Sequence, residues 1–382
     1  MRCREFPYFR IQMRNHECLS FRIQSEMRKR PHEFPDDILL RILSLLPVEI
    51  ICRFKCVCKS WQQLLSSKDF ARIHSLSTTF PSDTIAIVPV PSGFSDAIAP
   101  VRTGFSFIRI TPEDSIESPP LVRPPSGGES LTQLACSNGM LCYTTYLNPS
   151  IHVCNPVTKQ HLTLPVHPYY LPEIIAFYFD PVNHNFKLLI GKEHAVFSSA
   201  AGHWKQVAGL PASTSWQRPA ICVRGICYQV CREDNQNMLS AFDMETESSE
   251  RIQMPLQTMK ECKKWLLKLV EWKGQVCLVH RAGDCEFEIW GLIEEDKNWE
   301  KVISVPINER FQSKITWKSL VVPHCNSLFV AQLDWCSVDL SLPENEHGRR
   351  KSNWQFKWHD PIGFGVLHGL YPFTPTLNYL GS

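Results

Sequence analysis

Apolar residues are densest in the range Ile38–Ile51, where ten of fourteen positions are Ile, Leu or Val. A surface helix that buries one face needs only about three apolar positions in seven. Pro35 followed by two aspartates is typical of a helix start, because a Pro in the first turn has no N–H to lose and carboxylates there accept backbone hydrogen bonds. Pro47 ends that helix and opens the next. The stretch 34–65 therefore predicts three short helices with more than one apolar face.

A helical unit of this size cannot bury so much apolar surface in its own core, since small chains bury a smaller fraction of their surface on folding. Part of that surface is therefore expected to face a partner. The alternative is a helical hairpin buried inside a larger domain. It is disfavoured because the chain after Phe80 changes to Pro-punctuated β patterns, which offer no matching helical face.

The helical pattern fades after Phe70, and short strand-like runs follow it. Residues 84–88 form the first apolar run, and residues 105–110 alternate between apolar and polar positions as a half-buried strand does. Residues 111–130 are rich in Pro, Gly and Ser and predict an exposed loop.

A short unit then recurs along the chain, a small turn followed by an apolar strand. Its copies are Ser137–Tyr143, Val223–Tyr228, Trp272–Val279 and Cys325–Val330, with a weaker copy at His184–Leu189. A second unit combines a polar turn, a strand and a Pro, and its copies are Asn155–Pro165, Gly202–Pro211, Asp243–Pro255 and Lys297–Pro306. The units keep phase at steps of about 40 to 50 residues, the length of a four-stranded sheet with tight turns.

Such sheets protect their edges by stacking radially into a β-propeller. We expect about five to seven blades between residues 80 and 382, with an early and a late strand pairing to close the ring. Trp204 and Trp299 are expected to pack between blades. The aromatic tail, residues 354–375, is expected to supply a closing strand, and the basic segment 259–268 an exposed loop.

Three motifs in the helical stretch resemble the F-box family: Pro-Asp-Asp-Ile-Leu from Pro35, Leu-Leu-Pro ending at Pro47, and Val-Cys-Lys-Ser-Trp ending at Trp61. The family usually opens with Leu-Pro, and Phe34 stands in the place of that Leu. The resemblance implies docking on a Skp-type adaptor and, through it, on a cullin ubiquitin ligase. The residues that we expect to contact the adaptor are Phe34, Pro35, Ile38, Leu39, Ile42, Leu43, Leu46 and Pro47, with Val57, Cys58 and Trp61 shaping the same surface.

The β-rich part resembles the F-box-associated and kelch-like propellers that follow the F-box in large plant families. It departs from true kelch repeats, because the paired glycines that open kelch strands are missing. The expected fold class is α+β and multidomain, a small three-helix F-box followed by a mostly antiparallel all-β propeller-like domain. We expect a basic, disordered extension over residues 1–30, the F-box over 31–75, a linker with the first strands over 76–130, and the propeller over 131–382, with strands from residue 84 contributing.

Composition narrows the class of partner. The 382 residues are 43% hydrophobic and 20% charged, as in globular proteins. The net charge of +2 gives no global indication of binding to nucleic acid or to an anionic membrane.

None of the 16 cysteines forms a Cys-x-x-Cys pair, so we expect buried free thiols in a reducing compartment.

The first thirty residues carry eight Lys or Arg against three Glu. A solvated tail is the simplest interpretation, while a nuclear import patch at Arg28-Lys29-Arg30 and an organelle transit peptide are the alternatives. Charged residues interrupt any secretory signal, and no run of eighteen apolar residues exists that would span a membrane. The expected location is the nucleus, the cytoplasm or both.

Catalytic motifs are absent from the sequence. Gly-x-Ser-x-Gly, the phosphate-binding Gly-x-x-x-x-Gly-Lys-Ser/Thr and His-Glu-x-x-His do not occur. The pairs His161 with His167 and His194 with His203 match no zinc or copper spacing. Carboxylate clusters at 233–234 and 294–296 are expected in hairpin turns. We therefore expect no catalytic residue, metal or cofactor.

These observations predict the substrate-recognition subunit of a Skp–cullin–F-box ubiquitin ligase, in which the propeller binds a protein substrate that the sequence leaves unidentified. Three alternative hypotheses stay open: a ligase-independent interaction protein, a metal-dependent sugar-oxidising propeller, and a glycan-binding F-box protein with surface tryptophans. Adaptor binding without a cullin would favour the first, and bound metal the second.

Overall fold

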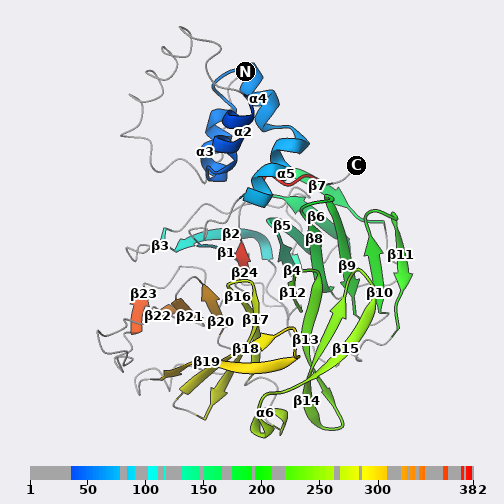
Figure 1. Cartoon of the computed structure of the whole chain (residues 1–382), viewed down its shortest axis with the longest axis vertical. Helices are drawn as coiled ribbons and strands as arrows, with labels where there is room; N and C mark the ends of the chain where they lie inside the picture. Colours follow the sequence, from blue (N-terminus) through cyan, green and yellow to red (C-terminus); the bar gives the residue numbers. More distant parts are fainter. Residues whose placement is uncertain are drawn as a thin grey trace.

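The computed structural model of the chain describes residues 36–77, 84–91, 102–110, 116–117, 131–145, 150–165, 174–191, 194–208, 220–261, 267–283, 286–307, 320–324, 327–331, 335–339, 356–359, 371–373 and 376–380. A small group of helices sits at one end of a larger ring of β-sheets, and α5 lies between the other helices and the blades (Figure 1).

The helical part contains the three predicted helices, α2 (Asp36–Ser44), α3 (Val48–Phe54) and α4 (Lys59–Leu65). Pro47 is the N-cap of α3, so it separates two helices as predicted. The prediction that the helical pattern fades after Phe70 is wrong, because a fourth helix, α5, runs over Lys68–Ser77. Ser67 starts it: the Ser67 hydroxyl accepts a hydrogen bond from the Phe70 N–H at 3.1 Å.

The described strands form six four-stranded antiparallel sheets, which we call blades 1 to 6 in chain order. Blades 1 to 3 consist of β24 (Tyr371–Phe373), β1 (Thr84–Pro91), β2 (Arg102–Ile110) and β3 (Ile116–Glu117); β4 (Leu131–Ser137), β5 (Met140–Thr145), β6 (Ile151–Asn155) and β7 (Gln160–Thr163); and β8 (Ile174–Asp180), β9 (Asn185–Ile190), β10 (Ala195–Ser198) and β11 (His203–Gln206).

Blades 4 to 6 consist of β12 (Ile221–Val223), β13 (Ile226–Glu233), β14 (Gln236–Asp243) and β15 (Ser248–Gln253); β16 (Leu267–Trp272), β17 (Gln275–Ala282), β18 (Glu286–Ile293) and β19 (Asn298–Pro306); and β20 (Leu320–His324), β21 (Ser327–Ala331), β22 (Trp335–Asp339) and β23 (Phe356–His359). The propeller prediction is confirmed, and the six blades lie within the predicted range.

The ring closes as predicted. Strand β24, the last strand along the chain, pairs with β1, the first strand, and Phe373 lies opposite Ile85. Residues 84–117, placed in the region of linker and first strands, thus supply three strands of a complete blade.

Both repeated sequence units are hairpin turns at fixed places in a blade. The first unit is the turn between the first two strands, where Asn138-Gly139, Arg224-Gly225 and Lys273-Gly274 have positive φ at both positions. Two-residue turns of this kind match the twist of the strands they join. The second unit is the turn between the last two strands, and Asp243 shows its chemistry: the carboxylate accepts hydrogen bonds from the N–H groups of Glu245 and Thr246.

Apolar side chains fill the spaces between blades. One buried cluster joins blades 2 and 3, a second joins blades 3 and 4, and a third joins blades 4 and 5. Trp299 is 8% exposed and donates its indole N–H to the Gln253 carbonyl of the preceding blade at 2.8 Å. Trp204 packs on the cluster of blades 2 and 3, with its indole N–H 3.4 Å from the Pro165 carbonyl. Both tryptophans therefore pack between blades, as predicted.

One predicted loop is partly a helix. Residues 257–261 form α6 (Gln257–Glu261), and the side chain of Met259 is fully buried in the cluster of blades 4 and 5. The Asn237 amide donates a hydrogen bond to the Met259 carbonyl at 2.7 Å. The segment is therefore anchored by an apolar side chain, and the prediction of an exposed loop is wrong for residues 259–261, which belong to α6.

Candidate adaptor-binding surface

The helices α2 to α5 share one small core. Leu43, Ile51, Leu65 and Phe70 are each at most 2% exposed within it. The ring of Trp61 packs edge-on against Phe54, with ring centroids 5.3 Å apart. The four helices thus share a small interior, to which Val157 and Leu377 from outside the helices also contribute.

Three large apolar side chains remain outside that core. Ile38, Ile42 and Leu45 are 47%, 51% and 48% exposed. They follow one another at spacings of four and three residues, so they lie on one side of α2 and the turn after it. We call these three residues the apolar stripe. Full burial of a Leu or Ile side chain contributes about 1.5–3 kcal/mol, and because these side chains are about half exposed, a partner that covers them gains about half of that for each. The stripe is therefore suited to a protein contact.

The predicted adaptor contacts divide into four groups. Ile38, Ile42, Pro47 and Cys58 are exposed. Leu39, Leu46, Val57 and Trp61 are partly exposed. Phe34 and Pro35 lie outside the described residues. Leu43 is buried in the helical core, so its prediction as a contact residue is wrong: its side chain supports the surface from beneath.

Leu45 is exposed on the same face but is not among the predicted contacts. Its signal was present, because Leu45 lies seven residues after Ile38 and three after Ile42, on the same helical face. Leu39, next to Ile38 of the stripe, is a poor site for a charge substitution that tests adaptor binding. Leu39 packs partly against the helical core, so a charge at Leu39 would disturb folding as well as binding.

Cys58 is an exposed thiol at the N-cap of α4. Its sulfur lies 3.1 Å from the Ser60 hydroxyl oxygen. Hydrogen bonds from that hydroxyl and from the Trp61 N–H hold the pKa of the Cys58 thiol below its ordinary value, because both favour the thiolate. Among the cysteines of the described part, those inside the blades differ: burial raises the pKa of the Cys154 thiol to about 12.

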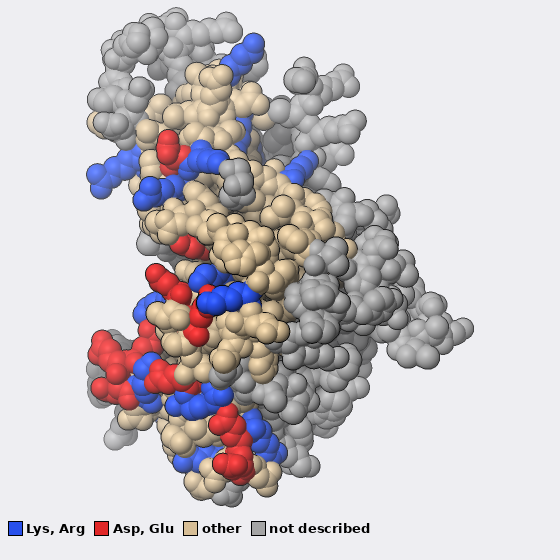
Figure 2. Space-filling model, turned by 90° about the vertical axis from the view of Figure 1, so that its right-hand side faces the viewer, with Lys and Arg blue, Asp and Glu red and all other residues tan. Residues whose placement is uncertain are grey.

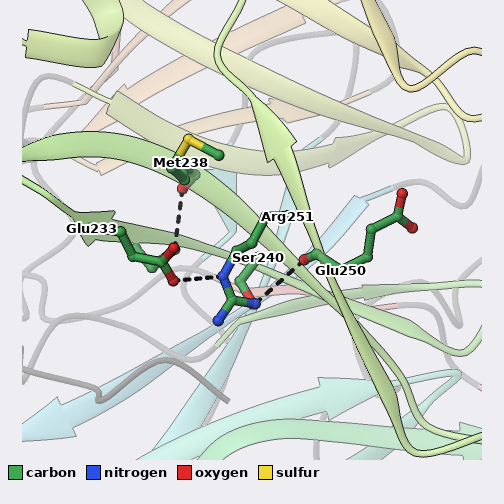
Figure 3. Close-up of polar contacts among 6 residues, drawn as sticks. Glu233, Met238, Ser240, Glu250 and Arg251 are labelled. Carbon is green, nitrogen blue, oxygen red and sulfur yellow. Dashed lines mark hydrogen bonds and ion pairs between the residues drawn. The ribbon is translucent and has the colours of Figure 1, made fainter. Parts of the chain in front are cut away.

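The blades carry polar clusters, and Figure 3 shows the one centred on Arg251 in blade 4. The Arg251 guanidinium donates hydrogen bonds to the Glu233 carboxylate at 2.6 Å, to the Ser240 hydroxyl at 3.0 Å and to the Glu250 carbonyl at 3.4 Å. These residues tie β13, β14 and β15 together. A guanidinium cannot act as a base, and it already neutralises the nearby carboxylate, so the cluster is a cross-strand clamp.

A second cluster lies across β17, β18 and β19 in blade 5. The Glu288 carboxylate accepts hydrogen bonds from Lys301 at 2.7 Å and from Trp290 at 3.4 Å, and it lies 3.2 Å from the His280 ring nitrogen. Burial by itself would raise the pKa of Glu288, but the hydrogen bonds from Lys301 and His280 outweigh it and hold the pKa below its ordinary value. An ionised, fully bonded carboxylate of this kind stabilises the sheet.

Of the two histidine pairs considered from the sequence, the structure describes both members of one, His194 and His203, and it does not bring them together. His194 and His203 lie at opposite ends of the β10–β11 hairpin, and His167 is outside the described residues. His161 instead stacks on His152, with Nε2 of His161 3.1 Å from Nδ1 of His152. No group of three or more His, Cys, Asp or Glu side chains suited to a metal occurs among the described residues.

The surface of the blades is mixed in charge. Acidic and basic side chains alternate over the blades on the face drawn in Figure 2. Ion pairs between neighbouring blades explain part of this pattern, among them Lys297 with Glu250 and Arg224 with Glu294. Of the helices that the structure describes, none is long and apolar enough to cross a membrane.

Comparisons with known proteins agree with this architecture. Residues 32–73 match the model of the F-box domain, and residues 106–338 match that of the F-box associated beta propeller domain. A putative F-box protein of Arabidopsis thaliana is 24% identical over 75% of this chain and 82% of its own length. An F-box protein of the same plant is 25% identical over 72% of this chain and 75% of its own length.

Solved structures are more distant. A chain of a nidogen/laminin complex matches 75% of this chain and 97% of its own length, with a TM-score of 0.45 and 10% identity. That likeness carries no argument about function. The propeller model matches more than half of the chain. The chain therefore belongs to the F-box associated beta propeller family and carries an F-box domain ahead of its propeller.

Proposed function

We propose that this protein is the substrate-recognition subunit of a Skp–cullin–F-box ubiquitin ligase. The observation that carries the proposal is the apolar stripe of Ile38, Ile42 and Leu45, which lies in the matched F-box domain and stays exposed beside the buried core of the helices. F-box domains in general bind Skp-type adaptors. The stripe supplies the apolar area that such contact needs, and the propeller supplies a separate surface for a protein substrate.

In this role the protein catalyses no reaction itself, as is general for F-box proteins. Its contribution to ubiquitin transfer is tethering, because a bound substrate meets the charged ubiquitin-conjugating enzyme at a high effective concentration instead of by free collision. The polar clusters around Arg251 and Glu288 agree with this role, since their hydrogen bonds are used within the sheets.

Affinity purification from plant tissue tests the proposal. The full chain is compared with Leu45→Asp and with the matched control Leu162→Asp, which places the same charge on a half-exposed leucine (37%) of strand β7 in the propeller. We expect adaptor and cullin with the wild type and the control, and their loss with Leu45→Asp. Adaptor without cullin in the wild-type sample would support the ligase-independent alternative, and neither protein would contradict the proposal.

We also propose that the protein acts in the nucleus, the cytoplasm or both. The basic run Arg28-Lys29-Arg30 supports a nuclear fraction, although it lies outside the described residues. A fluorescent fusion of the full chain tests this. Replacing the three residues by Ala is expected to lower the nuclear signal, and a signal confined to mitochondria or plastids would contradict the proposal.

A further inference from the structure

The last described residues lie between the F-box and the propeller. We call residues 376–380, Thr376 to Leu380, the C-terminal strap. They follow β24, the strand that closes the ring. Leu377 is 1% exposed and belongs to the same buried cluster as Leu43 and Phe70 of the F-box. Val157, from the β6–β7 turn of blade 2, joins that cluster too. The strap therefore completes the core of the helical part.

The buried side chain of Asn155 in blade 2 binds the strap at two points. The Asn155 amide nitrogen donates hydrogen bonds to the carbonyls of Thr376 at 3.1 Å and Asn378 at 2.7 Å. Its oxygen accepts one from the Val157 N–H at 2.8 Å. Asn155 is 0% exposed, so removing it would leave buried backbone groups without these partners.

Other bonds hold the strap to the same blade. The Asn138 carbonyl, in the β4–β5 turn, accepts hydrogen bonds from the Thr376 hydroxyl at 3.2 Å and the Asn378 amide at 3.0 Å. The Gln160 side-chain oxygen accepts one from the Leu380 N–H at 2.8 Å. Two hairpin turns and the start of β7 thus bind three of the five strap residues, Thr376, Asn378 and Leu380.

Tyr379 links the strap to the F-box. Its hydroxyl donates a hydrogen bond to the Ser66 carbonyl at 2.6 Å. Ser66 is the C-cap of α4, where carbonyls lack helical partners. Burial raises the pKa of the Tyr379 phenol, which keeps it a neutral donor. The strap therefore has one side bonded to blade 2 and the other bonded to a helix of the F-box.

We propose that the C-terminal strap is a positioning element that holds the F-box in one orientation on the propeller. The functional consequence of this inference rests on the proposed function, because in a ubiquitin ligase the orientation of the F-box sets which lysines come near the ubiquitin-conjugating enzyme. The apolar stripe residues are exposed and do not belong to the buried cluster that Leu377 enters. Loosening the strap is therefore expected to leave adaptor affinity unchanged and to alter ubiquitin transfer.

Hydrogen exchange on the full chain tests the positioning element without any partner. Two variants are compared with the wild type: a chain that ends at residue 375, and Tyr379→Phe, which removes one hydroxyl. Asn298→Ala is the control for a substitution outside blade 2, the strap and the F-box, since this asparagine lies at the start of β19 in blade 5. We expect exchange in α4 and α5 to rise about tenfold or more in the shortened chain and less in Tyr379→Phe, with blades 4 and 5 unchanged.

Unchanged exchange in α4 and α5 of the shortened chain would overturn the inference. Faster exchange in blades 4 and 5 of both variants would overturn it as well, because the strap would then support the whole ring and not the position of the F-box. These results do not depend on adaptor binding, so they are separate from the failure of the proposed function.

A second readout concerns orientation itself. With purified adaptor, cullin and ubiquitin enzymes, the lysines of this chain to which the complex attaches ubiquitin are mapped by mass spectrometry. We expect wild type and Tyr379→Phe to bind the adaptor within about twofold of each other while the pattern of modified lysines broadens. An identical pattern in wild type, Tyr379→Phe and the shortened chain would contradict the positioning role.

Discussion

Leu43 and Leu45 stand two positions apart in one apolar run, yet they have opposite surroundings. Leu43 is 2% exposed and Leu45 is 48% exposed. The sequence predicted helices and an excess of apolar surface, but it could not assign each leucine to core or surface. That assignment depends on what packs from elsewhere, including Phe70 of the missed helix α5 and Leu377 from the other end of the chain.

Alanine substitutions separate the two leucines. Leu43→Ala should cost about 2–5 kcal/mol in stability of the helical part, because it leaves a cavity in the core. Leu45→Ala should stay within about 0.5 kcal/mol, as exposed substitutions usually do. Hydrogen exchange of the α2 amides in the adaptor-free chain measures both, and equal effects would contradict the burial of Leu43.

Individual polar residues also decide turns. Asp180 accepts hydrogen bonds from the N–H groups of Val182 and Asn183, in the same way as Asp243 and Asn155 do in their turns. This local chemistry is visible in the sequence, which explains why the turns were predicted well. The second task of Asn155, binding the strap, lies more than 200 residues away and has no local signal.

Glu288 gives a pH-dependent prediction at the residue scale. Its folded pKa is lowered, so the stability that it contributes is present at neutral pH and above its unfolded pKa, and is lost as pH falls through the folded value. Glu288→Gln should therefore lower the unfolding temperature at pH 7, and the difference from wild type should shrink toward pH 3. A difference that grows in acid would contradict the ionised carboxylate.

Helices and strands were predictable to different degrees. The repeat of turn and strand placed the hairpins of blades 2 to 5, because each needs positive φ or side-chain capping at a fixed place. The short helices α5 and α6 were missed. Their few turns lack long-range periodicity, and their apolar anchors, Phe70 and Met259, point into clusters built by other segments.

The two interblade tryptophans should differ in energetic weight. Trp299→Phe is expected to cost about 1–3 kcal/mol, because it leaves the Gln253 carbonyl without its donor in a buried place. Trp204→Phe should cost less, since its indole N–H lies 3.4 Å from the Pro165 carbonyl and is less buried. Denaturant unfolding of both variants measures this, and an equal or reversed order would contradict the assignment.

At the scale of the whole molecule, the last described residues have two tasks. Strand β24 closes the ring on β1, and the strap that follows packs against the F-box. The sequence predicted ring closure, because an unpaired first blade would leave an open edge. It gave residues 376–380 no role of their own, since contacts with blade 2 and α4 cannot be seen in the local pattern.

The most direct test of the account is the affinity of a purified Skp-type adaptor for the full chain, measured by calorimetry. Leu45→Asp should weaken binding by about 100-fold or more, which corresponds to about 2.7 kcal/mol and lies within the cost of burying a carboxylate in an apolar contact. Leu162→Asp should bind as the wild type does. Equal affinities for all three chains, or no binding by the wild type, would contradict the assignment of the apolar stripe to adaptor binding.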